Sequence, residues 1–155
     1  MKRKLLYIFL ILGLVFSEDS STKLPKFKFK TLDKKKVYLK EFYNDGPIAV
    51  NVWNLSCEPC KKEMKYLNEY HKKYADKGFE VVSINIDTPR SISKVKSYIK
   101  SVKFDFTILS DPRSEFFRKT GGNIMPYLVL INSDGTIFKR KVGFNPGEEK
   151  KLEQD

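Results

Sequence analysis

Residues 48–60 read IAVNVWNLSCEPC, a mostly apolar run followed by a short polar segment and a pair of cysteines. The run Ile48–Trp53 follows the breaker Gly46-Pro47 and predicts a buried strand. Cys57 and Cys60 are the only cysteines of the chain and stand where a helical pattern begins. Two thiols at this spacing can close into a disulfide or open into a dithiol, and this couple carries two electrons. The segment therefore indicates redox chemistry.

The N-terminus has the pattern of an export signal. Basic residues 2–4 precede the apolar run Leu5–Phe16, and the polar stretch that follows favours cleavage after Ser17. The run is shorter than the roughly 17–25 residues of a usual membrane span, and an uncleaved anchor is the alternative. We expect a signal peptide over residues 1–17, a linker over 18–25 and a single domain over 26–155, large enough to bury a core without disulfides.

The predicted export and the net charge indicate the compartment in which the protein works and the kinds of partner it can have. An extracytoplasmic location lets disulfides persist, so reduction of the cysteine pair needs an electron donor. The net charge of +11 falls to +8 without residues 1–17, and lysines are spread along the chain with no nucleic-acid recognition module. We therefore expect a solvated basic surface, a monomer and no nucleic-acid partner.

The remaining pattern alternates strands and helices. Residues 26–30 and 37–39 suggest a surface hairpin with one wetted face. After the cysteines, the pattern predicts a helix ended by Gly78, a strand over 79–86, a helix over 91–102, a strand over 104–109, a helix from Asp111 to Gly121, a hairpin of 127–131 with 137–142, and a short helix from Asn145. This order predicts an α/β three-layer sandwich with a mixed central sheet.

Four segments carry a family resemblance: residues 51–53, 57–63, Met125-Pro126 and 130–135. Over residues 25–145 the chain resembles the thioredoxin superfamily, and within it the TlpA-like and ResA-like exported thiol-disulfide oxidoreductases. The resemblance implies a thioredoxin-like sandwich with an added N-terminal β-hairpin. It also implies a protein disulfide as substrate, with apocytochrome c as one candidate, and a membrane reductase as electron donor. The N-terminal apolar segment would be the membrane tether if it is not cleaved.

The two cysteines receive separate roles. Cys57 at the helix N-terminus is the expected nucleophile, because unpaired N–H groups and the helix dipole stabilise a thiolate there. Cys60, one turn deeper, is the expected resolving thiol. Glu63 resembles a glutamate of ResA-like proteins, and we expect it to exchange a proton with Cys60. The alternative for Glu63 is an exposed glutamate paired with a lysine.

By the same resemblance, Pro126 should follow a cis bond and position an extended substrate chain beside the cysteines. An ordinary trans proline at a strand edge is the alternative. Two positions depart from the family pattern, Ser56 before the first cysteine and Tyr127 after the proline, and both should border the substrate groove. Trp53 is expected to pack near the motif or simply in the core.

Charges near the cysteines oppose one another. Glu58 should disfavour a thiolate at Cys57, whereas Lys61 and Lys62 should favour it. Asn51 stands where thioredoxin has a buried aspartate, and an amide cannot exchange protons in the same way.

Other functions remain to be weighed. The pair could be an inert disulfide or half of a zinc site, but His71 is eleven residues beyond Cys60, roughly 16 Å along a helix, and is expected to be a satisfied helix-face histidine. A thiol oxidase or isomerase of the same fold, a peroxide reductase and a copper-delivering chaperone are further alternatives. Peroxiredoxins have a threonine three residues before the reactive cysteine, where this chain has Asn54. Copper-delivering proteins of this fold have three residues between their cysteines, whereas this chain has two. We expect no metal and no cofactor besides the redox-active disulfide.

Overall fold

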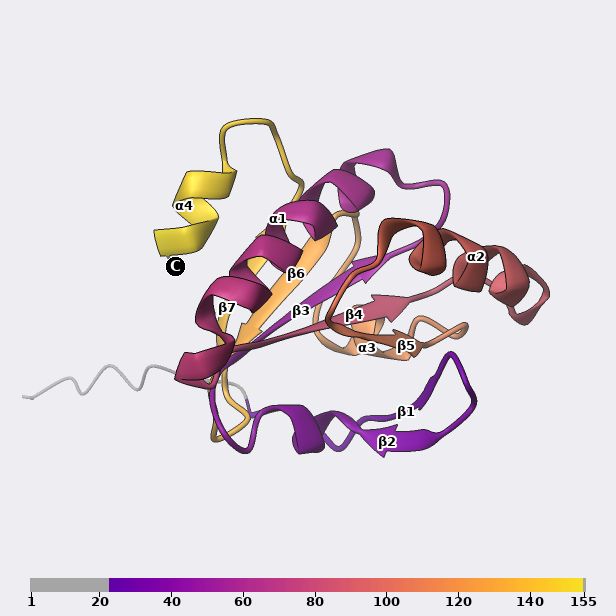
Figure 1. Cartoon of the computed structure of the whole chain (residues 1–155). Coiled ribbons are helices and arrows are strands. Elements are labelled where there is room, and N and C mark those ends of the chain that lie inside the picture. The colour runs from indigo at the N-terminus through magenta and orange to yellow at the C-terminus, as the bar shows by residue number, and fades with distance from the viewer. Residues whose placement is uncertain (1–22, 155) are drawn as a thin grey trace, which may run out of the picture.

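The computed structural model describes residues 23–154 and contains a seven-stranded sheet in the order β2-β1-β5-β4-β3-β6-β7 (Figure 1). The strands are β1 (Lys28–Thr31), β2 (Lys36–Tyr38), β3 (Ile48–Trp53), β4 (Glu80–Asn85), β5 (Thr107–Ser110), β6 (Tyr127–Ile131) and β7 (Ile137–Val142). Strands β3, β4 and β5 are parallel, while β6 and β1 run antiparallel to their neighbours, so the predicted mixed sheet is confirmed.

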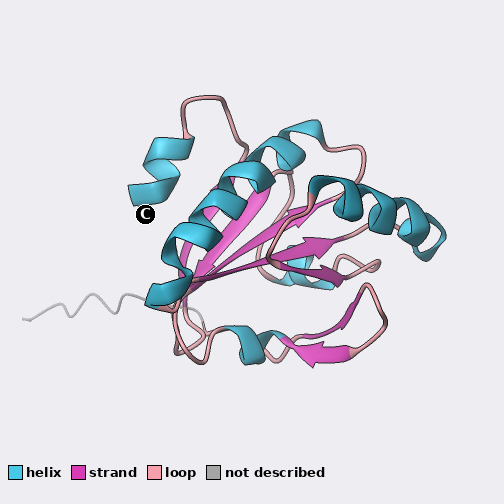
Figure 2. Ribbon diagram, in the orientation of Figure 1, coloured by secondary structure: helices cyan, strands magenta, loops and turns pink. Residues whose placement is uncertain are grey.

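Helices cover both faces of the sheet (Figure 2). They are α1 (Glu58–Tyr74), α2 (Ile92–Val102), α3 (Glu115–Lys119) and α4 (Glu149–Gln154), with short 3-10 turns at 39–42, 75–77 and 89–91. Helices α1 and α2 lie on one face and α3 on the other (Figure 1). Gly78, with φ of 82°, follows the last turn after α1, as predicted. Within residues 23–154, none of the helices is long and apolar enough to cross a bilayer.

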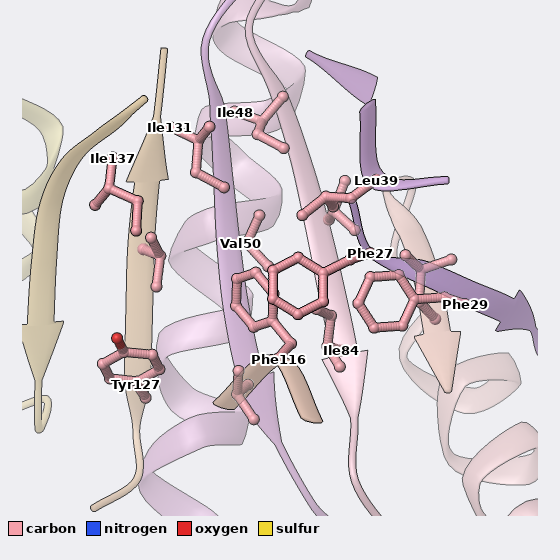
Figure 3. Close-up of a cluster of buried hydrophobic side chains, with 14 of the residues drawn as sticks. Phe27, Phe29, Leu39, Ile48, Val50, Ile84, Phe116, Tyr127, Ile131 and Ile137 are labelled. Atoms are coloured by element: carbon pink, nitrogen blue, oxygen red, sulfur yellow. The ribbon is translucent and has the colours of Figure 1, made fainter. Parts of the chain in front are cut away.

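Each face of the sheet has its own core. On the α3 side, aromatic rings from the hairpin pack on Phe116 and on aliphatic side chains of the central strands (Figure 3). The α1 side holds Trp53, Cys60, Met64 and Leu128. The alternation in the hairpin explains its place: Phe27 and Phe29 point into the core, and the alternating lysines 26, 28 and 30 are exposed to water. Strand β1 then pairs with β5, which adds the predicted hairpin to the edge of the main sheet.

Two predicted helix boundaries are wrong. Helix α3 begins at Glu115 and not at Asp111, because Ser114 has a left-handed backbone with φ of 52° and Asp111 accepts a hydrogen bond from the Phe116 N–H. Helix α4 begins at Glu149, because residues 145–148 form a turn in which the Glu148 carboxylate accepts from the Asn145 N–H. The predicted signal peptide, 1–17, and most of the predicted linker, 18–25, lie outside the described residues.

Strand direction brings the distant parts of the predicted site together. Strand β3 ends at Trp53 and the chain then reaches the cysteines at the start of α1. Strand β6 is antiparallel to β3 and begins opposite Val52. Pro126, which precedes β6, therefore lies at the same end of the sheet as Cys57 and Cys60.

Candidate active site

Cys57 and Cys60 form a disulfide at the N-terminus of α1. Cys57 caps the helix: its sulfur accepts a hydrogen bond from the Cys60 N–H at 3.3 Å, and its carbonyl accepts from the Lys61 N–H. Cys57 is half-buried, whereas Cys60 has no exposed surface. The sulfur nearer to solvent is thus the one that the first turn of the helix stabilises.

A carboxylate at the end of β4 holds the loop that leads to Cys57. The Leu55 N–H and the Asn85 amide each donate to Asp87 Oδ2 at 2.8 Å, and the Asp87 N–H donates to Asn85 Oδ1. Sequence reasoning missed both side chains, because an Asn and an Asp after a strand are ordinary turn residues. The exposed Ser56 donates from both its hydroxyl and its backbone N–H to Asn54 Oδ1.

The charges beside the cysteines are paired with each other. Lys61 Nζ lies 2.7 Å from Glu58 Oε1 and 5.2 Å from the centre of the Tyr98 ring. The hydrogen bond from Lys61 lowers the pKa of the Glu58 carboxyl, which is fully exposed. Of the charges predicted to act on Cys57, Glu58 and Lys61 are thus paired with each other, and Lys62 also lowers the pKa of Glu58.

Glu63 lies inside the protein. Its side chain has no exposed surface, and neither carboxyl oxygen has a hydrogen-bond partner among the described residues. Burial raises the pKa of Glu63 to about 8, against a lowering influence of Lys141 and a further raising influence of Glu148. The alternative of an exposed glutamate is wrong. Cys60 and Glu63 are three residues apart on the buried face of α1, where side chains are neighbours.

The Met125–Pro126 bond is cis, as predicted. Pro126 is buried, and its carbonyl accepts a hydrogen bond from the Gly143 N–H at 2.8 Å. The expectation for Tyr127 is wrong: its side chain does not border a groove but lies in the α3-side core, where its hydroxyl donates to the Thr120 carbonyl at 2.6 Å (Figure 3). Successive residues of a strand face opposite sides, and this register turns the Tyr127 ring away from α1.

Two other predicted positions have clear surroundings. Trp53 is fully buried in the same cluster as Cys60, and its ring centre lies 5.5 Å from that of Tyr98, so it packs both in the core and near the motif. His71 Nδ1 accepts a hydrogen bond from the Val81 N–H, and burial lowers the pKa of its imidazole. His71 is thus the satisfied helix-face histidine that was predicted. Residues 23–154 contain no group of three or more His, Cys, Asp or Glu side chains suited to a metal ion.

Comparison with known proteins agrees with this arrangement. The sequence model of the family described as Redoxin matches residues 19–155. The thiol-disulfide oxidoreductase ResA of Bacillus thuringiensis subsp. konkukian is 32% identical over 125 residues, which cover 81% of this chain and 70% of the relative. ResA of Bacillus anthracis is 30% identical over the same shares.

Solved structures share the fold. The crystal structure of a protein from Chlorobium tepidum, assigned as a thiol:disulfide interchange protein DsbE, superposes with a TM-score of 0.78 at 28% identity. The superposition covers 86% of this chain and 92% of the other. The predicted thioredoxin-like architecture is thereby confirmed.

Proposed function

The chain belongs to the Redoxin family and is a thiol-disulfide oxidoreductase, and from this premise we propose that its Cys57–Cys60 couple reduces disulfides of proteins outside the cytoplasm. The asymmetry of the two sulfurs carries the proposal. Cys57 is the more accessible and sits at the helix N-terminus, whereas Cys60 is fully buried behind it. An external disulfide can meet Cys57 first, and only Cys57 can present a mixed disulfide to Cys60.

The reaction begins from the dithiol. The Cys57 thiolate attacks one sulfur of the substrate disulfide, and the other substrate sulfur leaves as a thiolate that takes up a proton from solvent. Cys60 then loses its proton and attacks Cys57 Sγ, which releases the second substrate sulfur as a thiolate that also takes up a proton from solvent. Two electrons pass from the protein to the substrate: the substrate ends as a dithiol, and Cys57 and Cys60 end as the disulfide that the structure contains.

Glu63 is the proposed acceptor of the Cys60 proton. Cys60 is excluded from water, so bulk solvent has no direct path to its thiol. The Glu63 carboxyl is the buried acid one turn away, and a pKa raised to about 8 brings it close to the usual range of a thiol. Glu63 as a carboxylate would take the proton during resolution and return it when the disulfide is reduced again.

Pro126 is the proposed support for the substrate chain. It lies at the cysteine end of the sheet, and its ring has no N–H to donate. Met125, directly before it, is only partly buried and packs against the cores on both faces of the sheet. We propose that the Met125 backbone pairs with an extended substrate segment whose disulfide then meets Cys57.

The proposed location and partners follow from the predicted export signal and from the chemistry. An oxidised pair outside the cytoplasm must be reduced again by a donor, for which a membrane thiol reductase is the proposed class. The proposed substrates are envelope proteins, with apocytochrome c as one candidate. The N-terminal apolar segment Leu5–Phe16 would tether the domain if it is retained.

Insulin reduction with dithiothreitol as the electron donor tests the function. The parent protein should accelerate insulin precipitation, and Cys57→Ser should remove this acceleration entirely. The exposed Ser56→Ala change next to the motif is the matched control and should keep most of the activity. Full activity in Cys57→Ser would disprove the assignment of the nucleophile.

A further inference from the structure

A row of side chains crosses the sheet beneath α1. In the strand register, Ser83 of β4 pairs with Asn51 of β3, Asn51 with Leu128 of β6, and Leu128 with Lys141 of β7. Cross-strand partners point to the same face of a sheet, and Leu128 belongs to the core on the α1 side. Lys141 therefore points toward the same helix face that carries Cys60 and Glu63.

Lys141 is an unusual member of this row. Its ammonium nitrogen is buried and makes no hydrogen bond with any described residue, although 17% of the side chain is exposed. The nearest anion is Glu148 in the turn before α4, with Oε2 at 3.8 Å from Lys141 Nζ. A buried ammonium without direct hydrogen bonds is costly unless nearby negative charge stabilises it.

The charged groups around the Glu63 carboxyl come from two elements outside α1. Lys141 and Glu148 are the charged groups that act on it, with opposite signs, from β7 and from the turn before α4. The groups beneath α1 on β3 and β4, Asn51 and Ser83, are uncharged and buried. On α1 itself, the neighbouring reactive group is Cys60. The charge that reaches Glu63 therefore comes from the β7 side of the site.

Glu148 is held in place by its own turn. Its two carboxyl oxygens accept from the Asn145 N–H at 3.1 Å and from the Asn145 side-chain amide at 3.3 Å. These hydrogen bonds lower the pKa of Glu148 and so favour its carboxylate form. A fixed anion at the rim thus faces the Lys141 ammonium.

We propose that Lys141 is a positioning residue for the redox reaction: its ammonium stabilises the Glu63 carboxylate that accepts the Cys60 proton. This inference rests on the proposed role of Glu63. Before resolution Glu63 is the carboxylate and Cys60 the thiol; afterwards Glu63 holds the proton and the Cys60 sulfur is bonded to Cys57. Lys141 stabilises the first of these states and so controls the pH at which resolution begins.

The test compares single variants of the full domain by carboxyl-carbon NMR titration of Glu63 in the oxidised protein, with Glu63→Gln identifying the signal. Lys141→Met should raise the apparent pKa of Glu63 by about one unit or more, because the stabilising cation is lost. Glu148→Gln should lower it, because a repelling anion is lost. Lys141→Arg should stay near the parent value. Lys139→Met removes the same charge from the same strand and face and should have less than half the effect of Lys141→Met.

The pH profile of insulin reduction, measured on the same samples, should move in the same direction as each titration. The proposal would be overturned if Lys141→Met and Lys139→Met gave the same Glu63 pKa. It would also be overturned if Glu148→Gln raised the Glu63 pKa by as much as Lys141→Met. A moved titration with an unmoved activity profile would also overturn it, while insulin reduction by the parent would still support the proposed function. If Lys141→Met does not fold, the opposite shift expected for Glu148→Gln and the rescue by Lys141→Arg decide the question.

Discussion

Cys60 and Glu63 lie one turn apart on α1, and both side chains are fully excluded from solvent. This relationship separates the two sulfurs chemically as well as spatially. In the proposed reaction, Cys57 meets the substrate first, and its sulfur accepts a hydrogen bond from the Cys60 N–H in the first helical turn. The buried thiol needs a proton acceptor inside the protein, and Glu63 is the adjacent carboxyl.

The order of attack predicts a trapped intermediate. Cys60→Ser should keep the nucleophile and remove the resolving thiol, so a mixed disulfide between Cys57 and the substrate should accumulate. Mass spectrometry after incubation of the reduced variant with oxidised insulin would detect this adduct. Cys57→Ser, treated in parallel, should form far less adduct, because its remaining thiol at Cys60 is buried. Equal trapping by the two variants would contradict the assigned roles.

Burial of Glu63 predicts an unusual dependence of stability on pH. Burial raises the pKa of Glu63 from 4.5 to about 8, so the folded state holds more protons than the unfolded state between these pH values. The free energy of unfolding should therefore fall as the pH rises from about 4.5 to about 8, and this contribution should be flat above that range. Urea unfolding at a series of pH values measures it.

The matched variant is Glu63→Gln, compared with the parent in the oxidised state, where the cysteines do not titrate. The difference in unfolding free energy between the two proteins should change by roughly 3–5 kcal/mol between pH 4.5 and pH 8.5. Titration of His71 affects both proteins and cancels in this difference. Parallel stability curves would show that the Glu63 pKa is not raised.

Asp87 should matter for both stability and rate. Asp87→Ala removes the acceptor of the Leu55 N–H and of the Asn85 amide, and we expect a loss of roughly 2–3 kcal/mol in the free energy of unfolding. Insulin reduction should slow several-fold, because the loop before Cys57 loses its anchor. Asp76→Ala, at an exposed position after α1, should change stability by less than about 0.5 kcal/mol. An unchanged rate in destabilised Asp87→Ala would show that this anchor does not position Cys57.

Tyr127 should be structural and not a determinant of specificity. Tyr127→Phe removes the hydroxyl that donates to the Thr120 carbonyl, which still accepts from Arg140 Nε at 2.9 Å. We expect the free energy of unfolding to fall by about 1 kcal/mol and the KM for short disulfide-containing peptides to stay unchanged. Peptide kinetics and urea unfolding check the two quantities separately. A changed preference among peptides, with stability unchanged, would show that Tyr127 contributes to substrate binding.

Local patterns in the sequence carry much of the fold. Alternating Phe and Lys at residues 26–30 predict the hairpin, the run Ile48–Trp53 predicts the central strand, and the repeat after Cys60 predicts α1. The start of α3 could not be predicted in this way, because the left-handed backbone of Ser114 has no signal in its residue type. Pairing of β1 with β5 is likewise a long-range contact that no local pattern contains.

The candidate site also has parts that the sequence predicts and parts that depend on long-range packing. The two cysteines lie in one short motif, and the family pattern pointed to the cis bond before Pro126. The burial of Glu63 and the position of Lys141 beneath α1 depend on how the helix and the strands pack, and the strand register sets the face of β7 on which Lys141 lies. Lys141 follows two other basic residues in β7, a run that normally indicates a solvated strand, so the sequence alone does not distinguish it from its neighbours.

The reduction potential of the Cys57–Cys60 couple, measured by equilibration with glutathione buffers, tests the central claim most directly. A reductase requires a potential well below that of the oxidant DsbA, and we expect a value below about −200 mV. A value near about −120 mV would contradict the proposed direction of electron flow and make the protein a thiol oxidase of the same fold.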